Sequence, residues 1–241
     1  MLHKPENIQA LSKWLAKPAG ASLLKLEHKQ VSLLTAAMFG YDAVILGPAE
    51  FTSCLQDCQI KRKFIVNVGA SLRAGPDEAH AGPPAGVAYP NMCSRHDKLA
   101  IATESIDLVY IAHSLEFSNN PYEVLLEAYR ILRPDGHLII SMFNPLSLFG
   151  LWHPFKAKFM SSVKLKDWLG LLGFDIMQVN HFGYYIPELS LLERYGSRLK
   201  LPFGTAYVVE ASKKVASLTP IKPIWSTDTE IVNNDASEPT T

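Results

Sequence analysis

Residues 105–145 read SIDLVYIAHSLEFSNNPYEVLLEAYRILRPDGHLIISMFNP, and they carry the clearest structural signals of the chain. Residues 106–112 and 137–143 are apolar runs with the length of buried strands, and the second is almost uninterrupted. An uninterrupted apolar strand is typical of a parallel sheet that helices cover on both faces. Between the two runs, apolar residues recur at the i, i+3, i+4, i+7 spacing of an amphipathic helix. The stretch therefore predicts a strand, a helix and a second strand.

The predicted helix has recognisable boundaries. Asn120 stands before Pro121 and Glu123. This order predicts Asn at the N-cap, Pro at the first helical position and an acid in the first turn. After the helix, Pro134-Asp135-Gly136 has the composition of a tight turn, which leads into the second strand.

The same reading extends outward from this unit. Apolar periodicity predicts helices at 8–14, 23–39, 164–172 and 188–199, with a weakly helical segment at 49–58. Short apolar runs beside Gly or Pro predict further strands near 43–47, 63–68, 86–90, 174–180 and 203–211. Regular alternation of strands and helices indicates an α/β sandwich with a mostly parallel sheet.

Composition excludes several classes of protein. The 241 residues include 48% apolar and 19% charged residues, which is a globular mixture. Lys+Arg and Asp+Glu both number 23, so nothing indicates general attraction to nucleic acid. No apolar run approaches the roughly 18 residues of a membrane span, and the first residues lack a secretory pattern, so we expect a soluble cytoplasmic protein. The three cysteines, Cys54, Cys58 and Cys93, indicate buried free thiols rather than disulfides or a zinc site.

The stretch 105–145 also resembles a known family. It is similar to the class I S-adenosylmethionine-dependent methyltransferases from the fourth strand to the fifth, where the family typically reads S-F-D-L-V, D-P, L-x-E-x-x-R-V-L-K-P-G-G and often N-P. LKDWLGLLGFD at 165–175 resembles the type 11 group, and the segments 23–47 and 218–225 resemble a small, divergent bacterial branch of it. The matching residues are Asp107, Leu108, Val109, Pro121, Leu126, Glu127, Arg130, Leu132, Pro134, Gly136, Asn144 and Pro145.

This resemblance implies a Rossmann-like three-layer sandwich with a seven-stranded, mostly parallel sheet. Its last strand is expected to run antiparallel between the fifth and sixth. The implied organisation is N-terminal helices packing on the core at 1–40, a methyltransferase-like domain at 41–215 and a partly disordered tail at 216–241. Most matched residues are expected to build the sheet: Asp107 to cap a strand end, and Glu127 and Arg130 to pair at i, i+3.

A ligand of such a fold lies beyond the carboxyl ends of the strands, where the strand order reverses. Here these ends are Gly47, Gly69 and His113. The resemblance implies a glycine-rich turn after the first strand for the methionine part of the cofactor, an acid after the second strand for the ribose, and an Asp after the third strand for the adenine amino group.

The sequence departs from all three features. The turn at 46–50 has one glycine, and Pro48 removes a backbone donor. Gly69 stands where the acid is expected, although Asn67 is close enough to recover part of the ribose contact. Arg95 stands where the Asp is expected, although Asp97 is two residues away. The candidate cofactor-binding residues are thus Gly47, Asn67, Gly69, Arg95, His96, Asp97 and His113.

Two functions stay open from the sequence. The first is an S-adenosylmethionine-dependent methyltransferase with a small-molecule acceptor and a weak or lost cofactor site. The second is a non-catalytic protein of the same fold that binds a partner or an anionic ligand, which Arg95 would suit. His113 is the best-placed candidate for a general base, although a lone histidine at this position is more often a packing or cofactor-contact residue. No Walker-type phosphate loop or intact G-x-G-x-x-G is present.

Overall fold

The computed structural model describes residues 5–67, 91–93, 99–147, 157–183 and 204–214. In this part of the chain the helices are α1 (Pro5–Leu15), α2 (Pro18–Thr35), α3 (Pro121–Ile131) and α5 (Ser162–Leu172), with short 3-10 helices η1 (Ala49–Leu55) and η2 (Leu115–Phe117). The strands are β1 (Asp42–Leu46), β2 (Arg62–Asn67), β3 (Asn91–Cys93), β4 (Ile106–Ala112), β5 (Leu132–Phe143), β6 (Phe174–Phe182) and β7 (Ala206–Lys213).

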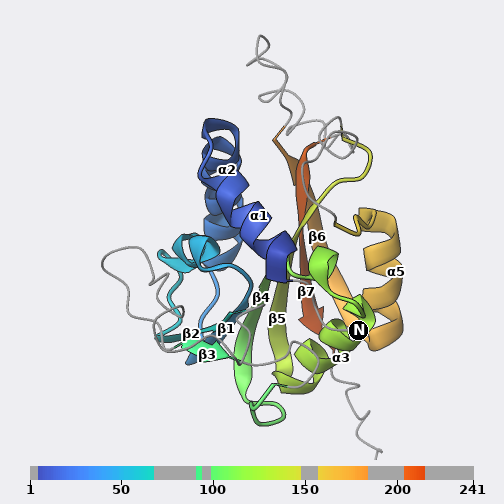
Figure 1. The fold of residues 1–241 in the computed structure, drawn as a ribbon. Helices are drawn as coiled ribbons and strands as arrows, with labels where there is room; N and C mark the ends of the chain where they lie inside the picture. Colours follow the sequence, from blue (N-terminus) through green and yellow to red (C-terminus); the bar gives the residue numbers. More distant parts are fainter. Residues whose placement is uncertain (1–4, 68–90, 94–98, 148–156, 184–203, 215–241) are drawn as a thin grey trace, which may run out of the picture.

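The strands form a sheet with the order β3-β2-β1-β4-β5-β7-β6 (Figure 1). The pairs β1–β2, β1–β4, β2–β3 and β4–β5 are parallel. Strand β7 runs antiparallel to both of its neighbours, β5 and β6. The predicted Rossmann-like α/β architecture, with the last strand antiparallel between the fifth and sixth, is therefore confirmed.

The third strand of the structure is β3 at Asn91–Cys93, whereas the predicted segment 86–90 lies outside the described residues. Strand β5 begins at Leu132, earlier than predicted, because the ladder passes from Ile106↔Leu132 directly to Leu108↔His137. The residues skipped by this register shift contain the predicted Pro-Asp-Gly turn, in which Asp135 has a φ of 59°. The predicted helix at 188–199 and the tail at 216–241 also lie outside the described residues.

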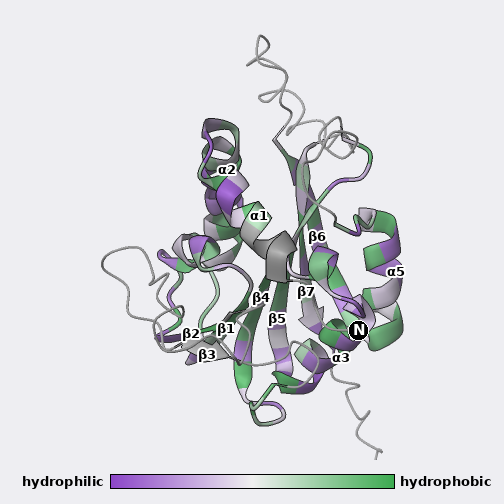
Figure 2. Ribbon diagram, in the orientation of Figure 1, coloured by the Kyte–Doolittle hydropathy of each residue, from purple (hydrophilic) through white to green (hydrophobic). Residues whose placement is uncertain are grey.

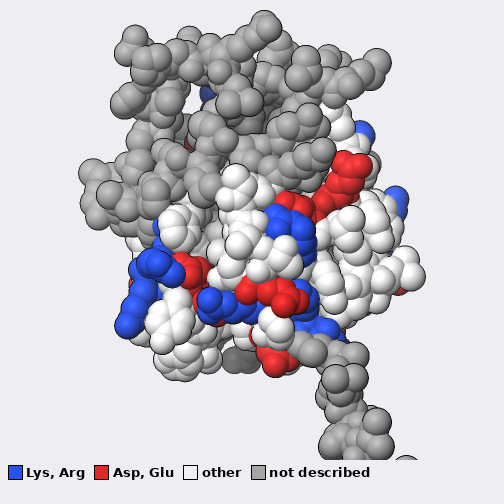
Figure 3. Space-filling view, turned by 90° about the horizontal axis from the view of Figure 1, so that it is seen from below, with Lys and Arg blue, Asp and Glu red and all other residues white. Residues whose placement is uncertain are grey.

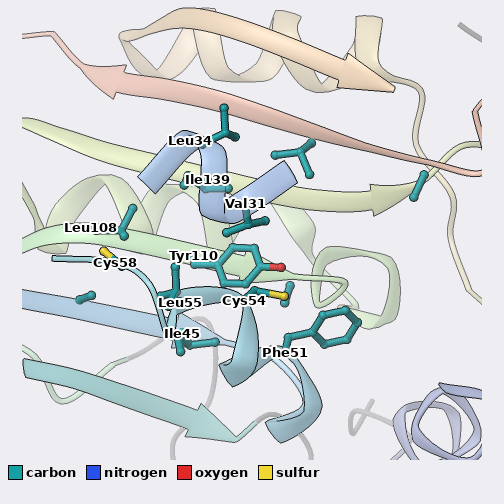
Figure 4. Packing of buried hydrophobic residues seen from close by; sticks show 14 of the residues in the cluster. Val31, Leu34, Ile45, Phe51, Cys54, Leu55, Cys58, Leu108, Tyr110 and Ile139 are labelled. Carbon is teal, nitrogen blue, oxygen red and sulfur yellow. The ribbon is translucent and has the colours of Figure 1, made fainter. Parts of the chain in front are cut away.

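Helices cover both faces of the sheet because neighbouring strand residues point to opposite sides. On one face, Ala43 and Ile45 pack against α1, α2 and η1; on the other, Val44 and Leu46 share a core with α3 and α5. Figure 2 shows the strands predominantly in hydrophobic colours and mixed colouring on the helices. Figure 4 shows the first of these cores, where Val31 of α2 lies close to Tyr110 of β4.

The start of α3 and the end of α5 match the helix boundaries predicted from the sequence. Helix α3 starts at Pro121 after the N-cap Asn120, as predicted, although the Asn120 side chain makes no capping hydrogen bond. Proline at the first position fixes the entry into the helix without it. Helix α5 ends as predicted at Gly173, whose φ of 90° lies in the left-handed region that favours glycine.

Asp107 joins three segments at the amino edge of the sheet. Its Oδ2 accepts from the backbone N–H groups of Tyr41 (2.7 Å) and Asp42 (2.9 Å), and its Oδ1 accepts from Arg133 (2.8 Å). Arg62 of β2 pairs with Asp42 of β1 at 2.6 Å on the same edge. Figure 3 shows acidic and basic side chains interspersed on the face seen from below. Asp107 thus holds the starts of strands together, as predicted.

Glu127 and Arg130 of α3 also serve the fold. Arg130 donates to both carboxylate oxygens of Glu127, at 2.7 and 2.8 Å, as their i, i+3 spacing predicts. The same guanidinium donates to the carbonyl oxygen of Ile101 at 2.9 Å, and Glu127 accepts from the Leu99 N–H at 2.7 Å. The pair therefore fixes the segment that leads into β4.

Two further features bear on function. No helix among the described residues has the length and apolar character needed to cross a membrane. Within the described ranges, no three His, Cys, Asp or Glu residues are arranged to hold a metal ion.

Cys54 and Cys58 are buried free thiols, as expected, and burial is the main cause that raises the pKa of Cys54.

Candidate functional site

The strand order reverses between β1 and β4, because β1 has β2 on one side and β4 on the other. All three strands are parallel, so their carboxyl ends meet at one edge of the sheet. This edge holds Asn67, the last residue of β2, and Gly47 and His113, which directly follow β1 and β4. We call it the ligand edge, because ligands of open α/β sheets bind at such a reversal.

Gly47 lies directly against the end of β4. A Cβ atom added at Gly47 would be 2.5 Å from the carbonyl oxygen of Ala112, which is closer than side chains approach. The Gly47 N–H donates to the carbonyl oxygen of Val66 at 3.4 Å, and the Ser114 hydroxyl donates to that of Leu46 at 2.7 Å. The glycine therefore permits close contact between the ends of β1 and β4.

His113 is fully buried and lies between two carboxylates. Its Nε2 is 3.1 Å from Oε2 of Glu27, and its Nδ1 is 3.1 Å from Oε2 of Glu116. The rings of Phe51 and Phe143 flank the imidazole, with centroid distances of 5.1 and 4.1 Å. The His113 backbone has a φ of 48°, in the left-handed region that residues other than glycine seldom adopt.

The two carboxylates have further partners. Oε1 of Glu27 accepts from the Tyr110 hydroxyl at 2.7 Å, and that hydroxyl is also 3.2 Å from the hydroxyl of Ser141. Oε1 of Glu116 accepts from the backbone N–H of Phe143. We call Glu27, Tyr110, His113, Glu116 and Ser141 the His113 cluster. It joins α2, β4, η2 and β5 by polar contacts inside the core.

The carboxylates determine the charge of the imidazole. Burial disfavours the charged form, but Glu116 and Glu27 outweigh burial and raise the pKa of His113 to about 10. His113 is therefore an imidazolium at neutral pH, with an N–H directed to each carboxylate. An imidazolium whose two N–H groups are both engaged has no lone pair with which to accept a proton, so this arrangement disfavours the base role considered for His113.

The structure brings three of the seven candidate residues to the ligand edge: Gly47, Asn67 and His113. The other four, Gly69, Arg95, His96 and Asp97, lie outside the described residues, so their contacts stay predictions. A direct contact between His113 and a cofactor also stays a prediction, and it would require the His113 cluster to open.

Sequence reasoning missed both carboxylates of the cluster. Glu27 follows Leu23 by four residues and precedes Val31 by four, so it lies in the middle of the apolar stripe of α2. An acid at the centre of an apolar stripe is the signal that would have found it, because a buried carboxylate needs a partner. Glu116 gives no comparable signal, because the three residues of η2 are too few to show a periodic pattern.

The described part of the ligand edge fits an adenosyl cofactor only in part. The reversal of the strand order lies where ligands of open α/β sheets bind, and the backbone bends at Gly47, directly after β1. However, the Gly47 N–H donates to the protein itself, and both ring nitrogens of His113 face carboxylates. Ribose and adenine contacts would have to come from the segments that follow β2 and β3.

Comparisons with known proteins agree with this architecture. Residues 58–140 match the type 11 "Methyltransferase domain" family, a region that contains β2, β4, α3 and most of β5. The chain is 26% identical over 228 residues to the uncharacterized protein YafS of Escherichia coli, covering 89% of this chain and 86% of YafS. It is 35% identical over 57 residues to a malonyl-[acyl-carrier protein] O-methyltransferase of Laribacter hongkongensis, covering 24% of this chain and 19% of that protein.

Among solved structures, a SAM-dependent methyltransferase of Thermotoga maritima, described as a possible histamine N-methyltransferase, superimposes with a TM-score of 0.65. The two proteins are 22% identical, and the match covers 87% of this chain and 97% of the other, which shows a shared fold. Residues 58–140 are therefore similar to a methyltransferase domain, and the chain shares the fold of a class I S-adenosylmethionine-dependent methyltransferase at low sequence identity.

Proposed function

We propose that this protein is an S-adenosylmethionine-dependent methyltransferase that acts on a small-molecule acceptor. The observation that carries the proposal is the family match at 58–140, because it contains β2 and β4, two of the three strands whose ends form the ligand edge. When bound, S-adenosylmethionine supplies an activated methyl group, which a nucleophilic atom of the acceptor takes up in an in-line displacement. Such a reaction depends mainly on positioning, so it does not require a base on the protein.

We further propose that the cofactor binds weakly. The sequence has no acid at Gly69 and an arginine at position 95, where the family places carboxylates. A hydrogen bond to a charged group contributes on the order of 1.5–3 kcal/mol. Loss of two such anchors would weaken binding by roughly two to four powers of ten, at about 1.4 kcal/mol per power. Asp97 is the residue best placed in the sequence to restore one of them.

A second candidate function is a non-catalytic protein of this fold that binds an anionic ligand or a partner. Its support is the closed arrangement of the described ligand edge, where Ser114 donates to Leu46 and both nitrogens of His113 are engaged. Arg95 adds a cation near the predicted adenine position. Such a site would accept an anion more readily than a sulfonium.

Calorimetric titration of the full chain with S-adenosylmethionine, and separately with its demethylated product S-adenosylhomocysteine, tests the proposal. Saturable binding of both compounds with one-to-one stoichiometry is the expected result. Absence of binding at millimolar concentrations, together with a thermal shift by nucleotides or acidic metabolites, would replace the first function with the second.

A further inference from the structure

Glu27 has an unusual position for an acid. It lies at the centre of the buried face of α2, whose neighbouring residues Leu23, Val31 and Leu34 are apolar core residues. Burial of a carboxylate costs free energy unless hydrogen bonds and an opposite charge replace its water shell. A structural helix would gain more from an apolar residue at this position, so the acid calls for a specific role.

Both oxygens of Glu27 are used, and both contact β4 or the residue that follows it. Oε1 accepts from Tyr110 at 2.7 Å, and Oε2 lies 3.1 Å from Nε2 of His113. These contacts reach the point where the backbone enters the left-handed region at His113. Glu27 thereby holds the imidazolium that fixes the direction of the chain after β4.

The direction of that turn determines the ligand edge. The residue after His113 is Ser114, whose hydroxyl donates to the carbonyl oxygen of Leu46. Two residues later Glu116 returns to Nδ1 of His113 and accepts from the Phe143 N–H, which ties the turn to β5. A change in the His113 side chain would therefore move the backbone next to Gly47, where the cofactor is expected.

We propose that Glu27 is a positioning residue of the ligand edge: from the N-terminal helix α2 it holds His113, and His113 sets the turn that places Ser114 and Gly47 for cofactor binding. This inference rests on the proposed function, because it assumes that S-adenosylmethionine binds at this edge. It assigns the N-terminal helices a part in the site beyond covering the sheet.

A purely structural role for Glu27 makes a different prediction. In that case a packing variant of α2 and a Glu27 variant that lower the melting temperature by the same amount would weaken cofactor binding by the same amount. Val31→Ala provides the matched control, since Val31 is fully buried on the same face of α2 and belongs to the same core. This substitution removes apolar contacts without removing a partner of His113.

The test compares wild type, Glu27→Gln and Val31→Ala by calorimetry with S-adenosylmethionine and by thermal melting. Glu27→Gln should bind the cofactor about tenfold more weakly or worse, whereas Val31→Ala should bind it as wild type does despite a lower melting temperature. Unchanged affinity in Glu27→Gln, or an equal loss in Val31→Ala, would overturn the inference. No binding by wild type would instead reject the proposed function and this inference with it.

A spectroscopic measurement checks the intermediate step. The groups that face His113 are Glu27 from α2 and Glu116 from η2, with Tyr110 of β4 and Cys54 of η1 beside Glu27. In nitrogen-15 NMR of wild type at pH 8, His113 should show two protonated ring nitrogens, and in Glu27→Gln it should titrate at lower pH. A neutral His113 in wild type at pH 8 would overturn the inference.

A second variant covers the case in which Glu27→Gln does not fold. Tyr110→Phe keeps every charge of the His113 cluster and removes only the hydroxyl that donates to Glu27. Tyr110→Phe should weaken cofactor binding more than Val31→Ala does, even where the two variants lose the same amount of melting temperature. Binding equal to wild type in Tyr110→Phe would count against the inference.

Discussion

Glu27 and His113 lie 86 residues apart in the sequence and meet in the core, with 3.1 Å between Oε2 and Nε2. This contact joins α2 to the carboxyl end of β4, next to the reversal of the strand order. It also explains why an acid interrupts the apolar stripe of a buried helix face. The consequences of the contact can be measured through the protonation of His113.

The free energy of unfolding should fall as the pH rises from about 6.5 to about 10. The pKa of His113 is raised to about 10 in the folded state, so its contribution is complete below the unfolded value of 6.5 and is lost as the pH rises through about 10. In His113→Asn, which tolerates the left-handed backbone, this fall should be smaller, and the part that remains at the highest pH comes from the buried Cys54 thiol, whose pKa is also raised. Urea unfolding of wild type and His113→Asn at pH 6.5, 8 and 9.5 measures the free energy of unfolding. The same pH dependence in both proteins would contradict the expectation.

Gly47→Ala should destabilise the protein by about 1–3 kcal/mol, the usual cost of overpacking. Its new Cβ would meet the carbonyl oxygen of Ala112, a backbone atom that is fixed by the sheet. Gly170→Ala is the control, because a Cβ at that position of α5 meets nothing within 4 Å. It should stabilise the protein by about 0.4–1 kcal/mol, since alanine favours the helix. Denaturant unfolding measures both, and equal effects would show that the close approach at Gly47 is unimportant.

Asp107→Ala should reduce stability by about 2–3 kcal/mol, because the backbone N–H groups of Tyr41 and Asp42 and the Arg133 guanidinium lose a charged acceptor. Burial raises the pKa of Asp107, but these hydrogen bonds outweigh burial and keep the pKa below its usual value. Its contribution should therefore be present above about pH 3.8 and be lost as the pH falls further. Asp167→Ala on the exposed side of α5 should change stability little. Cofactor binding by Asp107→Ala should stay normal if this edge is purely structural.

Much of the fold could be predicted because its signals are local. The run at 106–112, the helix opened by Pro121 and the glycine that ends α5 each follow from neighbouring residues. The order of the sheet came instead from the family resemblance, since periodicity alone does not say which strands pair. Strand β3 offered the weakest signal, because the three residues described there are too few for a periodic pattern.

The candidate site was less accessible to sequence reasoning. Gly47, Asn67 and His113 could be placed at one edge because each ends or directly follows a strand. The partners of His113 could not be predicted, because Glu27 lies in a helix that precedes the whole sheet in the sequence. The charge state of His113 depends on two carboxylates, which only the tertiary structure brings to 3.1 Å from its ring nitrogens.

Arg95 is the residue whose charge separates the two proposed functions. It stands where the family resemblance places an Asp that accepts from the adenine amino group, and it would repel the sulfonium of the cofactor. Arg95→Asp should therefore strengthen binding of S-adenosylmethionine, because it removes the repulsion and restores the acceptor. Lys61→Asp, at the exposed residue directly before β2, makes the same change in net charge on the opposite edge and should leave binding unchanged.

The same variants test the non-catalytic alternative. If the natural ligand is an anion, nucleotides or acidic metabolites should raise the melting temperature of wild type and Lys61→Asp but not of Arg95→Asp, because a ligand that binds only the folded state stabilises it by mass action. An active enzyme that has moved its contacts elsewhere should instead lose cofactor affinity in Arg95→Asp, since the substitution disturbs a working site. Firm cofactor binding by wild type without any thermal shift by anions would leave methyl transfer as the function and remove the support for an anionic ligand.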